Sequence, residues 1–178
     1  PRFAEGELPL SPTERGTAIH LAMQFVRYEN CATLAGVRSE LERLGTLKML
    51  TAQQLAAVAP EKLLRFFTSE LGDFVRSAPK VAREFKFSIL EDAAIYDASL
   101  TGEKILLQGV TDCCVLEPDG LTILDFKSDH IKPGEEARRA EIYRGQLDAY
   151  ARALSRIFEL PVKRRILYFF ATDAAFSV

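Results

Sequence analysis

An acid and a lysine stand two residues apart in an apolar segment near the middle of the chain. The segment reads LTILDFKS over residues 121–128, and its apolar, β-branched composition predicts a strand. Side chains of a strand alternate between its two faces, so Asp125 and Lys127 point the same way, about 7 Å apart along the strand. A carboxylate and an ammonium therefore share one small space.

A second acid is expected beside Asp125. Residues 104–117 form another apolar-rich segment and run into the turn Pro118-Asp119-Gly120, which together predict an antiparallel hairpin. The hairpin brings Asp112 within reach of Asp125. Two adjacent carboxylates repel each other when both are ionised, and Lys127 supplies only one counter-charge. A divalent cation would resolve this conflict, so the pattern predicts a metal site.

The donor types indicate which metal and which chemistry. Carboxylate oxygens favour Mg²⁺ or Mn²⁺, and an imidazole from His20 would favour Mn²⁺ or leave the site tolerant of both. Such an ion beside a lysine can bind a phosphate oxygen and activate water. We therefore predict metal-assisted phosphodiester hydrolysis. The local sequence of His20 by itself favours a histidine at the edge of the core that makes one hydrogen bond.

Length and composition place these residues in a globular protein. With 178 residues, 48% of them apolar, we expect one domain whose core needs no disulfides. The three cysteines lack zinc-ligand or iron–sulfur spacing, which predicts buried thiols in a reducing, cytoplasmic location. No signal peptide or apolar run of membrane-spanning length is present. The chain begins at Pro1 rather than Met, which we interpret as a domain taken from a longer chain.

Charge is unevenly distributed along the chain. The net charge is −2, yet residues 131–165 hold nine Lys and Arg against five Asp and Glu. A basic flank beside an acidic site suits a metal-dependent enzyme that acts on phosphates. Charge alone equally fits the solvated faces of a helix.

Helices and strands must position these groups. Ser11-Pro12-Thr13-Glu14 has the form of a capping box and predicts the start of the helix that carries His20. Residues 31–77 have helical periodicity and no chemical motif. After Pro79 the period becomes that of a strand over residues 81–90. Its Glu84 is either a solvent-facing charge or a third acid turned toward the hairpin.

A long helix is predicted over residues 135–158, with Ile142, Leu147 and Leu154 on its inner line and Gln146 and Tyr150 one turn apart. Pro161 ends it.

A last strand then follows over residues 162–170, and a strand reached through a helix is typically parallel to its neighbour. The predicted fold is of the α/β class with a mixed sheet. It has N-terminal helices (11–77) and a core (79–170) of three antiparallel strands, a crossover helix and one further strand.

Four motifs, in this order, resemble the RecB-like branch of the PD-(D/E)xK nucleases. They are Arg15-Gly16-Thr17-x-x-His20, Gly109-Val110-x-Asp112, Asp125-Phe126-Lys127-Ser128 and Gln146-x-x-x-Tyr150. Residues 146–154 and the ending Leu167-Tyr168-Phe169-Phe170 look in particular like the C-terminal nuclease domain of AddA-type helicase/nuclease subunits. The resemblance spans residues 11–170; each motif alone is weak, whereas four at family-like spacing are strong.

The resemblance implies a restriction-endonuclease-like core and a role for each matching residue. It makes His20, Asp112, Asp125 and the backbone carbonyl of Phe126 metal ligands and Lys127 the catalytic lysine.

It also makes Gln146 and Tyr150 a helix pair that supports the site and contacts DNA. Glu84 matches a recurring acid of the family and is expected to support the ligands.

The function implied by the resemblance is that of a Mg²⁺- or Mn²⁺-dependent deoxyribonuclease of the exonuclease type that prefers single-stranded DNA. It would act in double-strand-break resection and recombinational repair, together with a helicase region of the parent chain and a second helicase/nuclease subunit. No membrane would be involved. No iron–sulfur cluster is expected, since the cysteines of the cluster-bearing relatives are missing. No ATP-binding loop is present either, so any motor lies elsewhere in the parent chain.

Two alternatives remain. One is a non-catalytic DNA-binding or scaffold domain of the same fold, which the intact Asp112, Asp125 and Lys127 disfavour. The other is a free-standing nuclease.

Overall fold

The structure is a computed structural model that describes residues 10–178, and the chain folds into two compact units. The first comprises the described part of Pro1–Ser77 with Lys127–His130 and Phe169–Asp173. The second comprises Ala78–Phe126, Ile131–Tyr168 and Ala174–Val178. The observation that the chain begins at Pro1 lies outside the described residues.

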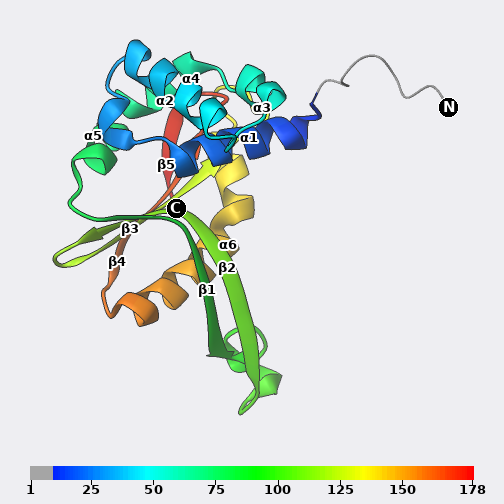
Figure 1. Cartoon of the computed structure of the whole chain (residues 1–178). Coiled ribbons are helices and arrows are strands. Elements are labelled where there is room, and N and C mark those ends of the chain that lie inside the picture. Colours follow the sequence, from blue (N-terminus) through cyan, green and yellow to red (C-terminus); the bar gives the residue numbers. More distant parts are fainter. Residues whose placement is uncertain (1–9) are drawn as a thin grey trace. The chain divides into compact units, whose positions relative to one another are not determined.

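Helices build the first unit (Figure 1, blue to green). They are α1 (Pro12–Phe25), the 3₁₀ helix η1 (Tyr28–Asn30), α2 (Leu34–Thr46), α3 (Ala52–Ala57), α4 (Pro60–Phe67) and α5 (Glu70–Ser77). The predicted capping box starts α1: the Ser11 hydroxyl accepts from the Glu14 N–H, and the Glu14 carboxylate accepts from the Ser11 N–H. Two otherwise unpaired donors of the first turn are thereby satisfied.

Aromatic side chains fill the core of this unit. The rings of Tyr28 and Phe67 meet edge to face with centroids 4.9 Å apart, and the Tyr28 hydroxyl donates to the Met23 carbonyl at 2.9 Å. Phe66 packs on Phe67 and on Phe170. Each such buried side chain stabilises the fold by about 1.5–3 kcal/mol.

A buried carboxylate ties α1, η1 and α2 together. Glu40 is 4% exposed and accepts hydrogen bonds from the Arg27 N–H, from the Asn30 amide and from the Arg43 guanidinium, each at 2.9 Å or less. Burial raises the pKa of Glu40, but the bonds from Arg43, Arg27 and Asn30 outweigh it and lower that pKa to about 2. This carboxylate is therefore a structural anchor of the first unit.

A five-stranded sheet forms the frame of the second unit, in the order β1-β2-β3-β4-β5. The strands are β1 (Val81–Asp92), β2 (Lys104–Glu117), β3 (Gly120–Lys127), β4 (Val162–Phe169) and β5 (Ala174–Ser177). Short 3₁₀ turns, η2 (Ala93–Ile95) and η3 (Ala98–Leu100), join β1 to β2.

Strand directions follow the prediction. β1, β2 and β3 are successively antiparallel, with Glu117 opposite Gly120 at the predicted turn. β4 runs parallel to β3, because the Leu121 N–H bonds the Pro161 carbonyl at one end and the Phe170 N–H bonds the Lys127 carbonyl at the other. The predicted α/β class with a mixed sheet is confirmed. β5 was not predicted, because a four-residue strand is too short to show an alternating pattern.

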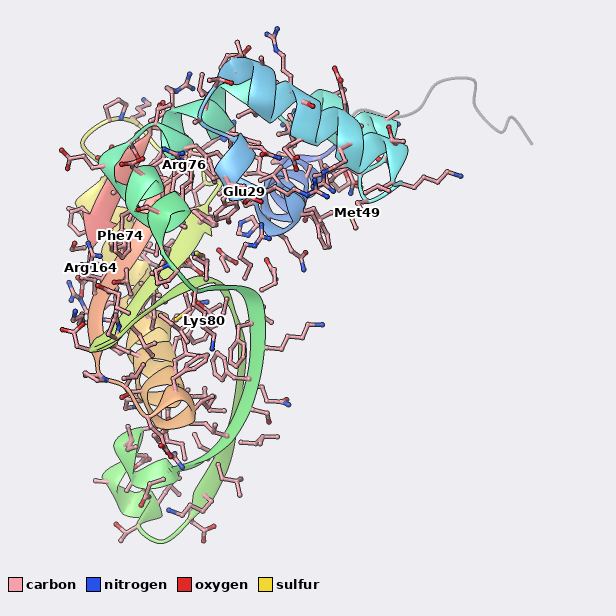
Figure 2. All side chains as sticks on the ribbon, turned by 60° about the vertical axis from the view of Figure 1, so that its left-hand side comes forward. Glu29, Met49, Phe74, Arg76, Lys80 and Arg164 are labelled. Carbon is pink, nitrogen blue, oxygen red and sulfur yellow. The ribbon has the colours of Figure 1, made fainter. Side chains whose placement is uncertain are left out.

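Helix α6 (Glu136–Phe158) crosses from β3 to β4 and packs on β1 and β2. In Figure 2, side chains project from both faces of the curved β1–β2 hairpin, one set toward α6 and the other away from it. Leu147 and Leu154 are fully buried as predicted, but Ile142 is 65% exposed. The prediction for Ile142 was wrong because five residues separate it from Leu147, which places it about 140° away around the helix.

A buried ion pair fastens the far half of α6 to the end of β1. The Arg152 guanidinium donates to both carboxylate oxygens of Glu91, and the Tyr96 hydroxyl donates to one of them at 2.6 Å. The bond from Arg152 lowers the pKa of Glu91. Glu91 thus stays charged although it is only 2% exposed.

The three cysteines are free and buried, as predicted. Burial raises the pKa of Cys114 to about 12 and raises that of Cys113 as well. Both are therefore protonated and poor metal ligands at neutral pH. Among residues 10–178, no helix combines the length and apolarity that a bilayer crossing requires.

Candidate metal site

Three acids lie in line across β1, β2 and β3. Arg83 pairs with Cys113 and Phe85 with Thr111, so Glu84 stands opposite Asp112. Cys113 pairs with Leu124, and the same register puts Asp112 opposite Asp125. Neighbouring strands are about 4.8 Å apart, and like charges directly opposite each other destabilise a sheet. The acid row therefore costs stability that the sheet itself does not recover.

Glu84 has an unusual backbone within β1. Its φ is +48°, in the left-handed region that costs a residue with a β-carbon about 1–2 kcal/mol, and it is missing from the ladder between β1 and β2. Carboxylate oxygens of Glu84 and Asp112 lie within 4.8 Å of each other. Backbone strain of this kind is concentrated at functional sites.

Asp112 is held by the backbone of the next strand. Its Oδ2 accepts a hydrogen bond from the Phe126 N–H at 2.7 Å. This bond continues the link between β2 and β3 beyond the last ladder pair and leaves the other oxygen of Asp112 for further contacts.

Asp125 and Lys127 flank Phe126 on β3. Asp125 is 5% exposed, Lys127 is half-buried, and the Phe126 ring is fully buried. Strand alternation puts the two charged side chains on one face of the strand and the Phe126 ring on the other. Both charged groups are thus carried by a strand whose buried ring fixes it in the core.

His20 belongs to the first unit. It is half-buried on the third turn of α1. One turn earlier, Gly16 touches the segment that follows Lys127: a β-carbon at Gly16 would lie 2.5 Å from the Ser128 hydroxyl oxygen. The glycine of the motif that ends in His20 is therefore what lets α1 approach the end of β3.

Gln146 and Tyr150 form a pair on α6. The Gln146 side-chain amide donates to the Tyr150 hydroxyl at 3.1 Å. The Tyr150 ring meets Phe87 edge to face at 5.0 Å and lies over Gly109, where a β-carbon would stand 2.7 Å from Tyr150 Cε1. Gly109, three residues before Asp112, thus provides the space that seats Tyr150.

Sequence reasoning understated Glu84. Strict alternation groups it with Lys86 and Ser88, which are exposed, and so suggests a solvent-facing charge. The left-handed φ of Glu84 breaks that alternation, and no residue type in the sequence announces it. Only the resemblance to a recurring family acid pointed to this position.

A model of the PD-(D/E)XK nuclease superfamily matches residues 2–176 of the chain. The chain belongs to this superfamily. The predicted family is therefore confirmed, and the mixed sheet with its helices is consistent with the restriction-endonuclease-like fold of PD-(D/E)XK nucleases.

Similar curated proteins are named as subunits of an ATP-dependent helicase/nuclease. The one from Desulforamulus reducens is 41% identical over 173 residues, and one from Bacillus cereus is 40% identical over 180 residues; each match covers 96% of this chain. The one from Desulforudis audaxviator is 36% identical over 98% of the chain. The chain spans 14% of the length of each relative, so it is similar to one nuclease part of these larger proteins.

Proposed function

We propose that this chain is a metal-dependent deoxyribonuclease that hydrolyses phosphodiester bonds of single-stranded DNA. The observation that carries the proposal is the acid row, in which Glu84 and Asp112 lie within 4.8 Å and Asp112 is bonded to the residue between Asp125 and Lys127. Membership of the PD-(D/E)XK superfamily supports the nuclease activity. DNA is the substrate we propose because the relatives are named as helicase/nuclease proteins.

The donor set fits a hard divalent cation. Mg²⁺ takes oxygen ligands at about 2.0–2.1 Å, so two ligands of one ion stand about 3–4 Å apart. The separation of the Glu84 and Asp112 oxygens needs only a small side-chain adjustment to reach this value. Binding would also remove the like-charge repulsion and so offset part of the cost of the left-handed φ at Glu84.

Each residue has a role in this proposal. Asp112, Asp125, His20 and the Phe126 carbonyl hold the ion, and Glu84 completes or supports the ligand set. When bound, Mg²⁺ or Mn²⁺ supplies positive charge that stabilises the phosphate and acidifies a water.

Lys127 projects from the same strand face as Asp125. Its ammonium orients the attacking water or donates to the phosphate oxygen that gains charge. Water adds to phosphorus, the bond to the leaving oxygen breaks, and the leaving oxygen takes up a proton.

Local structure supports a place for His20 in this set. Gly16, one turn before it, packs on Ser128, and Ser128 follows Lys127 directly in the chain. Imidazole is a regular ligand of Mn²⁺ and a tolerated ligand of Mg²⁺ sites. We therefore propose His20 as the nitrogen ligand rather than as a core-edge histidine.

The wider setting is part of the same proposal. By the names of its relatives, the chain would work beside a helicase region of the parent protein and with a second subunit, in double-strand-break resection and repair. Exonuclease action on the single strand that a motor delivers is the mode we propose. A cytoplasmic location stays a prediction.

A gel assay tests the activity. Labelled single- and double-stranded DNA is incubated with the purified chain and Mg²⁺, Mn²⁺ or chelator, and we expect chelator-sensitive cleavage that favours the single strand. Asp125→Ala should abolish cleavage while the protein stays folded, because removing one crowded acid relieves repulsion. Asp119→Ala is the matched control, since Asp119 lies in the turn of the same hairpin with its side chain 74% exposed. Cleavage unaffected by chelator would refute the metal mechanism.

A further inference from the structure

One face of α6 carries two rings and two polar side chains in a line. Arg139, Tyr143, Gln146 and Tyr150 occupy positions i, i+4, i+7 and i+11 of the helix. At 3.6 residues per turn they fall within a sector of about 60° and extend about 16 Å along the axis. We call these four residues the α6 stripe.

The inner end of the stripe is anchored and its outer end is open. Tyr150 is flanked on α6 by Ala153 and Leu154, which are fully buried, and its ring packs against Phe87. On the same face, Gln146 is exposed and Tyr143 is half-exposed. The helix thus keeps its core-facing line of residues but leaves the first half of that line accessible to a ligand.

An arginine lies over the outer ring. The Arg139 guanidinium carbon stands 5.5 Å from the centroid of the Tyr143 ring, within the range of a cation–π contact. Its neighbours of like charge behave differently: Arg138 and Arg144 are paired with Glu135 and Glu141 on other sides of the helix. Arg139 therefore brings a positive charge to an aromatic ring on the stripe.

An aromatic ring next to a cation is the combination with which proteins bind single-stranded nucleic acid. Every base has a flat face that stacks on an aromatic side chain, and the cation meets the phosphates between bases. Duplex DNA hides its base faces and cannot stack in this way. The ligand class that the stripe fits is therefore an unpaired strand.

We propose that Tyr143 and Arg139 form a stacking step that holds one unpaired base of the substrate strand. This inference rests on the proposed function, since it names the contact that would select single-stranded DNA for the acid site. Tyr143 stacks on the base and Arg139 binds the adjoining phosphate. Gln146, fixed by its bond to Tyr150, lies between this step and the anchored end of the stripe.

Binding measured in chelator separates this step from the chemistry. Anisotropy of a labelled thymidine oligonucleotide is compared with that of an abasic oligonucleotide of equal length, which keeps the phosphates but has no bases. Stacking on one base contributes roughly 5- to 150-fold in affinity. Tyr143→Leu, which keeps apolar bulk, should lose that factor for the thymidine strand and bind the abasic strand as the wild type does. Tyr143→Phe should retain it.

The charge and the ring have matched controls on the same helix. Ile142→Ala removes an exposed apolar side chain about 100° away from Tyr143 and should leave both affinities unchanged. Arg139→Ala should reduce the slope of log affinity against log salt by about 0.7, the loss of one phosphate contact on a single strand. Arg138→Ala should reduce it less, because that side chain is paired with Glu135.

Two results would overturn the stacking step. One is equal loss of affinity for both oligonucleotides in Tyr143→Leu, which would mean a structural role for the ring. The other is a wild type that binds the two strands equally well. A wild type that prefers bases in chelator but cleaves with neither Mg²⁺ nor Mn²⁺ would instead refute the proposed function and leave the stacking step standing.

Discussion

Oδ2 of Asp112 lies 2.7 Å from the backbone nitrogen of Phe126 and accepts its hydrogen bond. The bond joins the middle acid of the row to the residue that separates Asp125 from Lys127. A single side chain therefore has two functions in the proposal, since one oxygen holds β3 in place and the other can bind a cation. Substitution of Asp112 can separate these two functions.

Asp112→Asn should remove the metal site without loosening the strands. The amide oxygen still accepts from the Phe126 N–H, and the negative charge that a cation needs is gone. We expect the free energy of unfolding without metal to stay within about 1 kcal/mol of wild type, while calorimetry detects no Mn²⁺ binding. Asp112→Ala leaves the N–H without its acceptor and should be the less stable of the two variants. Equal stability of both would mean that the bond to Phe126 contributes nothing.

Glu84 should reverse the usual ranking of alanine and glycine. In a strand, glycine is normally less stable than alanine by about 0.5–1 kcal/mol, but at a φ of +48° the β-carbon is strained. We expect Glu84→Gly to be at least as stable as Glu84→Ala in urea titrations, and both to lose cleavage. Lys86, exposed on the same strand, provides the control pair, for which alanine should be the more stable. The ordinary ranking at both positions would contradict a left-handed Glu84.

Gly109→Ala should act through the ring of Tyr150. The new β-carbon would stand 2.5 Å from Phe87 Cζ and 2.7 Å from Tyr150 Cε1, and overpacking of this kind typically costs about 1–3 kcal/mol. Thermal melting should show that loss, and cleavage should fall because α6 is displaced. Gly145→Ala is the control: nothing lies within 4 Å of its β-carbon position, so it should stabilise α6 by up to about 1 kcal/mol. Similar effects at the two glycines would show that Gly109 is not a packing position.

Sequence alone predicted the frame of the site because its signals are local. A capping box, a two-residue alternation and a hairpin turn each depend on neighbours in the chain, and the start of α1, the strand that carries Asp125 and Lys127 and the turn at Gly120 all follow from them. The parallel arrangement of β3 and β4 followed from the rule for crossover connections. Such features need no knowledge of distant contacts.

Other features depend on contacts far apart in the sequence, and these the sequence did not reveal. The left-handed φ of Glu84, the space that Gly109 leaves for Tyr150 and the bond from Phe126 to Asp112 each join residues at least fourteen positions apart or break a local rule. Gly16 and Gly109 entered as motif letters through a family resemblance. Their physical reason, a close approach that a β-carbon would block, is visible only in the fold.

Acid should unfold the first unit through Glu40. The pKa of this carboxyl falls from its ordinary value of 4.5 to about 2 in the folded protein, so the folded state binds a proton less readily than the unfolded state. The resulting stabilisation is complete above pH 4.5 and is lost as the pH falls from about 4.5 to 2; it amounts to about 3 kcal/mol. Denaturation at stepped pH measures it. Glu40→Gln should be less stable at pH 7 and show a shallower decline across this window, and an unchanged pH dependence would exclude Glu40 as its source.

Lys127 should matter for the rate and little for binding. If its ammonium orients water or stabilises charge that develops on the phosphate, it acts chiefly in the transition state. Lys127→Ala should then lower kcat by about 10²- to 10³-fold, with KM for single-stranded DNA and the calorimetric affinity for Mn²⁺ nearly unchanged. Lys86→Ala, which removes an exposed lysine of β1, controls for loss of one positive charge and should leave kcat intact. Asp112→Ala and His20→Ala should weaken Mn²⁺ binding instead, and raising the Mn²⁺ concentration should restore part of the activity of His20→Ala, which lacks only a neutral ligand. If Lys127→Ala lost the ion as completely as Asp112→Ala, the lysine would serve to organise the acid row, and the catalytic role assigned to it would be wrong.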